Sequence, residues 1–269
     1  MRMRSGAMFW AFVLIVLGVV FLLQNLGILR VGWDVIWPIL LIAFGAFMLL
    51  GGLFRGSAST ETRSLAIPLD GAREARVEIH QGAGKLVIGA SADPMTLISN
   101  SFDGELGQSV RRDGDRLDVR LRQEHDWTFW MWPWNWSGTG WHWTAHLNRD
   151  IPMTLEMKPG ASQSEIDLRD LKVKSFKLDT GASTVDLTVP ATGQVTGRIK
   201  AGAATVRVRI PEGVALRVRA SLGAATLTVR GQRFSQLGGG GSYQSPDFES
   251  AAHRADLDID AGAATIEII

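Results

Sequence analysis

Four segments of the sequence decide the fold: Gly181-Ala-Ser-Thr-Val-Asp-Leu, Gly202-Ala-Ala-Thr-Val-Arg-Val, Gly223-Ala-Ala-Thr-Leu-Thr-Val and Gly262-Ala-Ala-Thr-Ile-Glu-Ile. The first three begin 21 positions apart. Earlier copies begin at Gly160-Ala161-Ser162 and at Gly82-Ala83-Gly84, which makes six copies in all. A fixed period of this length is the sequence signature of a repeat architecture.

Apolar and polar residues alternate after each glycine corner, as in Val206, Val208 and Ile210. A period of two is what a half-buried strand requires. The constant step predicts stacked rungs in fixed register, with glycine permitting φ > 0 and close stacking at the corners. We therefore predict a mainly β fold, a β-solenoid with rungs of about 21 residues. The alternative is a chance similarity within an ordinary β-sandwich.

The first part of the chain has a different character, because it contains two long apolar runs. Ala7 to Leu23 is uninterrupted, and Val35 to Phe54 is broken only by glycines and Pro38. Each run can cross a hydrocarbon core, which needs about 20 helical residues. A signal peptide is the rival interpretation of the first run, but no small-residue cleavage site follows it. We predict a two-helix transmembrane hairpin.

The charges that flank the two runs predict their orientation. Arg2 and Arg4 precede the first run and Arg55 and Arg63 follow the second, whereas only Arg30 lies in the connection. Under the positive-inside rule both ends face the cytoplasm. We therefore expect a multi-pass protein of the bacterial cytoplasmic membrane, with two spans and a cytoplasmic C-terminal domain.

These observations divide the chain into a hairpin at residues 1–55, a linker at 56–66 and the β domain at 67–269. Insertions at 90–150 and 231–250 interrupt the repeat array. The chain beyond Asp93 is expected to cap one end of the stack, and Arg112-Asp113-Gly114-Asp115 predicts a hairpin turn. The second insertion contains Gly238 to Gly241 and predicts a flexible loop.

Both parts of the chain resemble one group of bacterial proteins. Gly18-Val-Val-Phe-Leu-Leu-Gln-Asn-Leu-Gly27, followed by Trp37-Pro38-Ile-Leu-Leu-Ile-Ala-Phe-Gly45, resembles the membrane hairpin of LiaF-type proteins. Trp143-Thr-Ala-His-Leu-Asn148-Arg-Asp-Ile-Pro152, continuing to Gly160-Ala161, resembles the toast-rack, adhesin-like β domain that is often joined to it. The resemblance implies a role in sensing cell-envelope stress, in which LiaF restrains a membrane histidine kinase.

Composition and spacing point away from catalysis. The 28 basic and 27 acidic residues balance, which argues against a nucleic-acid partner, and the absence of cysteine excludes thiol chemistry. His142 and His146 could share a strand face as metal ligands, but exposed strand histidines are expected. Asp256, Asp258 and Asp260 could suggest a calcium site, but a charge ladder with Arg217 and Arg219 is favoured. We expect no catalytic residue, cofactor or metal.

Two surfaces are candidates for contacts. One is a basic strip that could attract an anionic surface, with solvated strand faces as the alternative; its residues are Arg198, Lys200, Arg217 and Arg219. The other is a tryptophan-rich segment that could cap the solenoid, enter a bilayer interface, stack on sugars or contact a partner. Its candidate contact residues are Trp130, Trp132, Trp134, Trp136, Trp141 and Trp143.

Together these features predict a non-enzymatic, membrane-anchored β-solenoid protein that regulates or senses the cell-envelope stress response. Its expected partners are the lipid bilayer and a membrane histidine kinase or another envelope protein. The hairpin also offers a means of oligomerisation. The alternative is an envelope scaffold, or a carbohydrate-binding or adhesin-like module displayed outside the membrane.

Overall fold

The structure is a computed structural model. It describes residues 62–104, 106–123, 141–229, 232–235 and 240–269, together with Pro38 and Ile42. The chain divides into two compact units, one of residues 1–58 with 132–137 and one of residues 59–131 with 138–269. Within the described residues, no helix has the length and apolar character needed to span a membrane. The predicted hairpin lies outside them, apart from Pro38 and Ile42.

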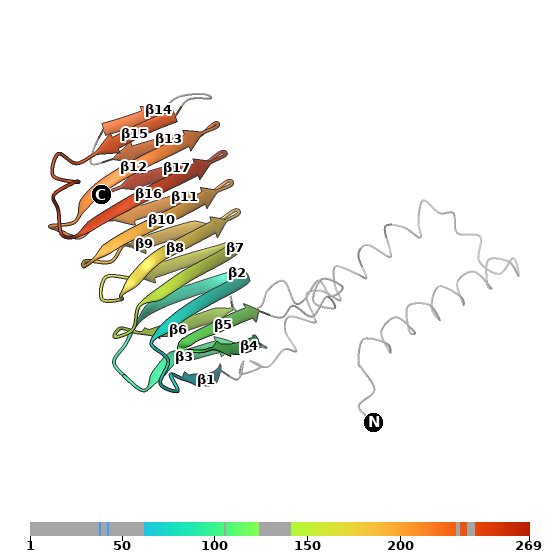
Figure 1. Ribbon diagram of the computed structural model, residues 1–269. Helices are drawn as coiled ribbons and strands as arrows, with labels where there is room; N and C mark the ends of the chain where they lie inside the picture. Colours follow the sequence, from blue (N-terminus) through green and yellow to red (C-terminus); the bar gives the residue numbers. More distant parts are fainter. Residues whose placement is uncertain are drawn as a thin grey trace, which may run out of the picture. The chain divides into compact units, whose positions relative to one another are not determined.

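The second unit is built from strands, as the alternating pattern predicts (Figure 1). The strands are β1 (Thr62–Pro68), β2 (Glu74–Ser91), β3 (Thr96–Asp103), β4 (Leu106–Asp113), β5 (Arg116–Gln123), β6 (His142–Asn148), β7 (Met153–Asp167), β8 (Val173–Thr180), β9 (Thr184–Thr188), β10 (Gln194–Ala201), β11 (Thr205–Arg209), β12 (Ala215–Leu222), β13 (Thr226–Val229), β14 (Gln232–Ser235), β15 (Gly240–Gln244), β16 (Arg254–Ala261) and β17 (Thr265–Ile268).

Each rung of the stack contributes one strand to each of two facing walls. β8, β10 and β12 lie in the first wall, and β9, β11 and β13 lie in the second wall. β2 and β7 are long enough to turn the corner and run through both walls, as their pairing over Ala75–Ile79 and Ala83–Ile88 shows. Neighbouring rungs pair in parallel, so corresponding positions of successive repeats lie side by side. The predicted stacked rungs are therefore present.

The spatial order of the rungs differs from their order in the sequence. The rung β16/β17 lies between β10/β11 and β12/β13, with Val195 and Leu216 both opposite Ala255. In the same way β2 lies between β5/β6 and β7. The units starting at Gly202 and Gly223 are therefore not neighbours in the stack. A constant repeat fixes which positions align, but it does not fix which copy lies next to which.

The space between the walls is filled by the inward-facing residues of every rung. Val206 and Val208 are fully buried, as the alternation predicts. Gly197 lies opposite Phe176 and Leu257 in the parallel register. A Cβ atom there would lie 2.3 Å from Phe176 Cζ and 2.7 Å from Leu257 Cδ2, so the missing side chain makes room for the phenyl ring.

The corner glycines form a column along one edge of the stack. A Cβ at Gly160 would lie 2.5 Å from the carbonyl oxygen of Gly82, and one at Gly223 would lie 3.0 Å from that of Gly262. The corresponding distance is 3.2 Å at Gly202 and Gly262 and 3.4 Å at Gly181. None of these five has a positive φ, unlike Gly213 at the opposite corner. Close stacking, rather than a left-handed backbone, is therefore the reason for glycine here.

Antiparallel strands close both ends of the stack. At one end β4 pairs with β5, β3 pairs with β6, and β1 pairs with β3; at the other end β15 pairs with β12 and β14 with β13. Asn148 helps to hold the first cap, because its side-chain amide donates to the carbonyl oxygens of Pro94 and Thr96. The predicted cap beyond Asp93 is confirmed, and so is the hairpin turn, where Gly114 has a φ of 58°.

Three parts of the predicted domain organisation differ in the structure. Residues 62–66 of the predicted linker belong to β1, because this strand pairs with β3. The predicted insertion at 90–150 supplies the rung β5/β6 as well as cap strands. The predicted flexible loop within 231–250 contains β14 and β15, because the last parallel rung still offers unpaired backbone groups to them.

Candidate functional site

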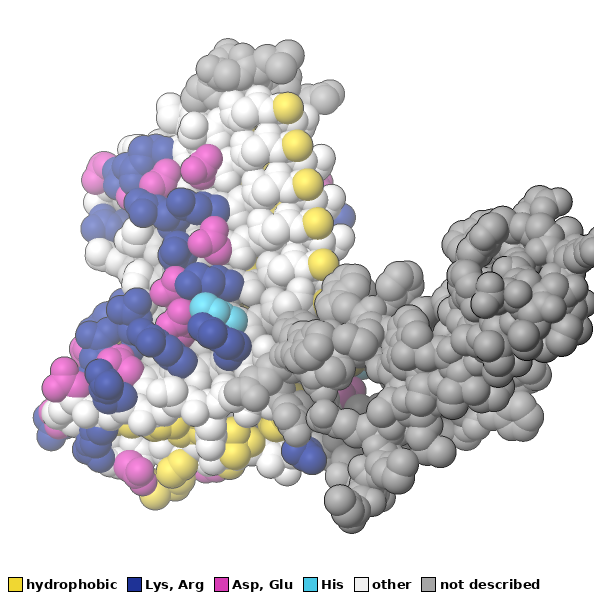
Figure 2. Space-filling model, turned by 90° about the vertical axis from the view of Figure 1, so that its right-hand side faces the viewer, with side chains coloured by type: hydrophobic (Ala, Val, Ile, Leu, Met, Phe, Trp, Pro, Cys, Tyr) yellow, Lys and Arg dark blue, Asp and Glu magenta, His cyan; other side chains and the backbone are white. Residues whose placement is uncertain are grey.

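The outer face of the first wall carries charged side chains in rows across the strands. Figure 2 shows Lys and Arg beside Asp and Glu along the stack. The parallel register produces this pattern, because outward positions of successive rungs stand opposite one another. One row runs Ser109, Arg120, Glu78, Glu156, Lys177, Arg198, Asp258, Arg219.

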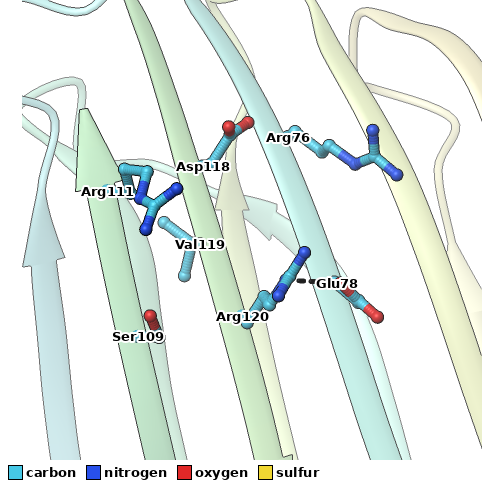
Figure 3. Close-up of a pocket in the computed structure, with 7 residues that line it drawn as sticks. All are labelled: Arg76, Glu78, Ser109, Arg111, Asp118, Val119 and Arg120. Carbon is cyan, nitrogen blue, oxygen red and sulfur yellow. Dashed lines mark ion pairs between the residues drawn. The ribbon is translucent and has the colours of Figure 1, made fainter. Parts of the chain in front are cut away.

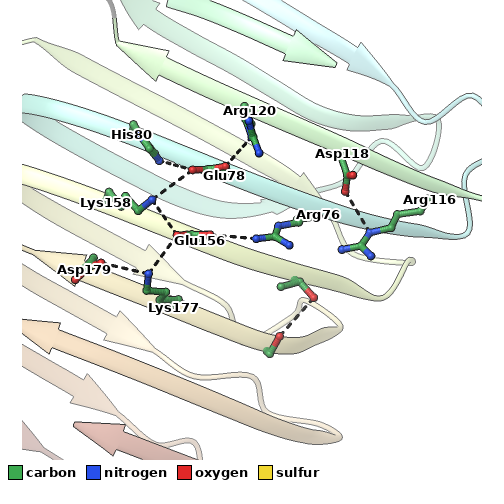
Figure 4. Close-up of polar contacts among 12 residues, drawn as sticks. Arg76, Glu78, His80, Arg116, Asp118, Arg120, Glu156, Lys158, Lys177 and Asp179 are labelled. Atoms are coloured by element: carbon green, nitrogen blue, oxygen red, sulfur yellow. Dashed lines mark hydrogen bonds and ion pairs between the residues drawn. The ribbon is translucent and has the colours of Figure 1, made fainter. Parts of the chain in front are cut away.

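Two glutamates lie directly opposite each other in this row. Glu78 on β2 pairs in register with Glu156 on β7, and both are mostly buried, with side chains 14% and 15% exposed. Like charges opposite each other destabilise a sheet unless they are compensated. Lys158 compensates for them, because its ammonium group lies 2.9 Å from Glu156 Oε1 and 3.4 Å from Glu78 Oε1 (Figure 4).

Four further side chains complete this network. His80 Nε2 lies 2.6 Å and Arg120 Nε 2.9 Å from Glu78, while Arg76 and Lys177 lie 3.3 and 3.4 Å from Glu156. The hydrogen bond from Lys158 is the largest cause that lowers the pKa of Glu156, to about 2. Burial raises the pKa of Glu78, but the hydrogen bonds from His80 and Lys158 outweigh it and the net shift is downward. Both carboxylates are therefore ionised at neutral pH.

A cavity of about 230 Å³ opens beside the network, over β4, β5 and β2 (Figure 3). Its lining residues are Arg76, Glu78, Ser109, Arg111, Asp118, Val119 and Arg120. Hydrogen-bond donors and charges thus dominate the wall, with Val119 as the one apolar lining residue. The cavity offers binding groups for a polar ligand.

The sequence alone did not reveal this cavity. The alternation places Arg76, Asp118 and Arg120 on outward positions, and the turn at Gly114 brings Arg111 opposite Asp118. However, the meeting of β5 with β2 depends on the order of the rungs, which the repeat does not encode.

Comparison with known proteins identifies the family. The model described as the N-terminal domain of toast_rack, DUF2154, matches residues 55–209, which is more than half of the chain. The chain belongs to this toast_rack family. A second family model, the LiaI-LiaF-like transmembrane region, matches residues 8–49. The resemblance to LiaF-type proteins is thus confirmed, and this is a membrane protein.

A solved structure shares the fold of this domain. A protein from Clostridium sporogenes ATCC 15579, provisionally described as a cell adhesion protein, is 16% identical with a TM-score of 0.63. The match covers 77% of this chain and 98% of that one. A provisionally described adhesin from Bacteroides fragilis NCTC 9343 is 8% identical over 78% of this chain and 98% of that one, but its TM-score of 0.21 carries no argument. No curated protein matches the chain.

The predicted basic strip of this toast_rack domain is interrupted. Its four residues lie on one wall, but β16 separates them and brings Asp256, Asp258 and Asp260 between the two basic strands. Arg198 lies 3.3 Å from Asp258, and Arg219 lies 3.2 Å from Asp256, which also pairs with Arg217. Lys200 stands opposite Asp260. The predicted charge ladder is confirmed, so the strip is a mixed surface.

The predicted tryptophan contacts fall into two groups. Trp130, Trp132, Trp134 and Trp136 lie outside the described residues, so their role stays a prediction. Trp143 is only 3% exposed, and its Nε1 donates to Asn100 Oδ1 at 3.3 Å. Its predicted contact role is therefore wrong, because its side chain faces the core. Trp141 is half-buried, and its carbonyl oxygen accepts a hydrogen bond from the Lys85 amide.

The two histidines considered as metal ligands are both exposed on β6. His142 Nδ1 lies 3.8 Å from Asp103 Oδ2. Among the described residues, this is the one ion pair that involves His142 or His146. Within those residues, no group of three or more His, Cys, Asp or Glu is placed to hold a metal ion.

Proposed function

We propose that this protein is a non-enzymatic, membrane-anchored regulator of a cell-envelope stress response that restrains a membrane histidine kinase. The observation that carries the proposal is the joining of a LiaI-LiaF-like membrane region at residues 8–49 to a toast_rack domain at 55–209. The resemblance to LiaF-type proteins supports the regulatory role. The stacked rungs support an interaction role, since they form a rigid surface lined with fixed charges.

The proposal also places the β domain in the cytoplasm. Arg2, Arg4, Arg55 and Arg63 flank the apolar runs, and the positive-inside rule puts such residues on the cytoplasmic side. Fusion of green fluorescent protein or alkaline phosphatase after Ile269 tests this placement. Fluorescence without phosphatase activity is expected. The opposite result would favour the second candidate, a module displayed outside, which the fold shared with the provisionally described cell adhesion protein suggests.

Regulation is tested by deleting the gene in its host and measuring transcription controlled by the kinase and its response regulator. Without the restraint, this transcription should rise severalfold in unstressed cells. Expression of the full chain should restore the low level. Residues 56–269 expressed alone are the matched control and should fail to restore it, because they lack the membrane region. Unchanged output after deletion, with or without a cell-wall antibiotic, would contradict the proposal.

A further inference from the structure

We propose that the cavity over β4, β5 and β2, here called the arginine cavity, binds a small phosphate ester. This goes beyond the regulatory role, because the ligand site belongs to the β domain itself and requires no protein partner. Three arginines line the cavity, Arg76, Arg111 and Arg120. A guanidinium group presents planar paired donors that match phosphate oxygens, and the Ser109 hydroxyl adds another donor.

The three arginines differ in whether their guanidinium groups already contact a carboxylate. Arg120 approaches Glu78 through Nε, and Arg76 approaches Glu156 through one terminal nitrogen, which leaves the other donors of each group. Within the described residues, the side chain of Arg111 makes no ion pair or hydrogen bond with a carboxylate. Arg111 is therefore the cation with most to gain from an incoming anion.

Two carboxylates also line the cavity, and each of them has a cation from outside the cavity beside it. Glu78 is in contact with His80 and Lys158 as well as Arg120. Asp118 Oδ1 lies 3.2 Å from Arg116 Nε. Because neighbouring cations already hold these two acids, the arginines of the cavity keep a net positive charge.

The size of the cavity limits the class of ligand. About 230 Å³ lies below the roughly 300 to 1,000 Å³ of pockets for drug-sized ligands. An oligosaccharide chain is too large for this volume, whereas a phosphate with a short polar substituent fits it. The wall is also well fixed, because Arg111, Asp118 and Arg76 stand in one row of paired strands and Ser109, Arg120 and Glu78 in the next.

The test titrates the full chain in a neutral detergent with glycerol 3-phosphate and with inorganic phosphate, using isothermal titration calorimetry. Arg111→Gln should weaken binding about tenfold or more, since it removes a charge-assisted contact. Asp118→Asn should tighten binding severalfold, since it removes a negative charge from the wall. Arg169→Gln is the matched control, because Arg169 is exposed and lies outside the cavity.

Opposite effects of Arg111→Gln and Asp118→Asn, with Arg169→Gln unchanged, would support the site. Equal weakening by Arg111→Gln and Arg169→Gln would overturn it, because only net charge would then matter. Absence of binding by the unaltered chain at millimolar phosphate ester would overturn it as well.

A second arm separates the two sources of such a ligand. The full chain is placed in nanodiscs of phosphatidylcholine alone or with phosphatidylglycerol, and glycerol 3-phosphate is titrated again. If glycerol 3-phosphate binds more weakly in the discs with phosphatidylglycerol, the lipid competes for the site. Loss of this difference in Arg111→Gln would identify a lipid headgroup as the ligand. Equal binding in both kinds of disc would identify a free phosphate ester. Both results support the site, and failure to bind in either disc would contradict it.

Discussion

Adjacent residues on one strand meet opposite environments in this domain. Val208 is fully buried, whereas Arg207 points outward between Asp186 and Glu267, at 3.1 and 3.3 Å. Val208→Asp should abolish cooperative folding, because an unpaired buried carboxylate costs several kcal/mol, comparable with the whole stability of a domain. Arg207→Ala should leave the melting temperature nearly unchanged, because its ion pairs are partly exposed. Thermal melting followed by circular dichroism compares them, and equal losses would contradict the register.

The corner glycines make a graded prediction, because their distances to the neighbouring carbonyl oxygen differ. Gly160→Ala should destabilise the domain most, by about 1 to 3 kcal/mol, since its Cβ would lie 2.5 Å from backbone. Gly223→Ala should cost less, and Gly181→Ala, at 3.4 Å, should be nearly neutral. Urea denaturation measures the series. A ranking unrelated to these distances would show that close stacking does not explain the glycines.

Pairs of strands set the electrostatics of the outer face, and Glu156 on β7 shows this best. Its pKa is lowered to about 2, chiefly by the hydrogen bond from Lys158. A carboxylate with a depressed folded pKa stabilises the fold above its ordinary pKa near 4.5 and loses that contribution as the pH falls toward 2. After allowance for screening, the loss is on the order of 1 to 3 kcal/mol.

Glu156→Gln should remove this part of the pH dependence. Stability measured by urea denaturation at pH 7, 5, 4 and 3 should fall less steeply for the variant than for the unaltered chain. Glu165→Gln is the control, because Glu165 is exposed on the other half of the same strand. If both variants kept the original slope, the network around Glu156 would not be what acid disrupts.

Much at the scale of elements could be predicted from the sequence. The alternation identified the inward residues, and Asp113-Gly114 identified the β4–β5 turn, because both depend on local chemistry. β14 and β15 could not be predicted in this way. Their residues carry no alternating apolar pattern, and they pair because the last rung leaves an open edge.

At the scale of the whole molecule, the order of the rungs could not be predicted from the repeat. Every copy aligns equally well with every other, so the repeat period does not predict which rungs are adjacent in the stack. The arginine cavity was missed for the same reason, since it joins Arg76 of β2 to Arg120 of β5 across a pairing between distant segments. Trp143 was misassigned because it ends a tryptophan-rich segment that suggested a contact surface, whereas its side chain is buried in the core.

The order of the rungs makes a prediction about protection from amide hydrogen exchange. β16 and β17 come last among the strands in sequence, but they have a parallel neighbour on both sides. Their amides should exchange as slowly as those of β10 and β11, and more slowly than those of the outermost strand β15. Mass spectrometry after deuterium labelling measures this. Fast exchange in β16 would mean that it lies at an end of the stack.

The interior position of β16 and β17 also matters while the chain is being made. When residues up to Val229 have left the ribosome, β10 and β12 are both present but the strand that separates them is not. They share the register that would let them pair directly, with Arg198 opposite Arg219. Like charges directly opposite each other oppose that pairing. In the complete chain Asp258 of β16 lies between these two arginines, 3.3 Å from Arg198, so the finished order of the rungs replaces that repulsion with attraction.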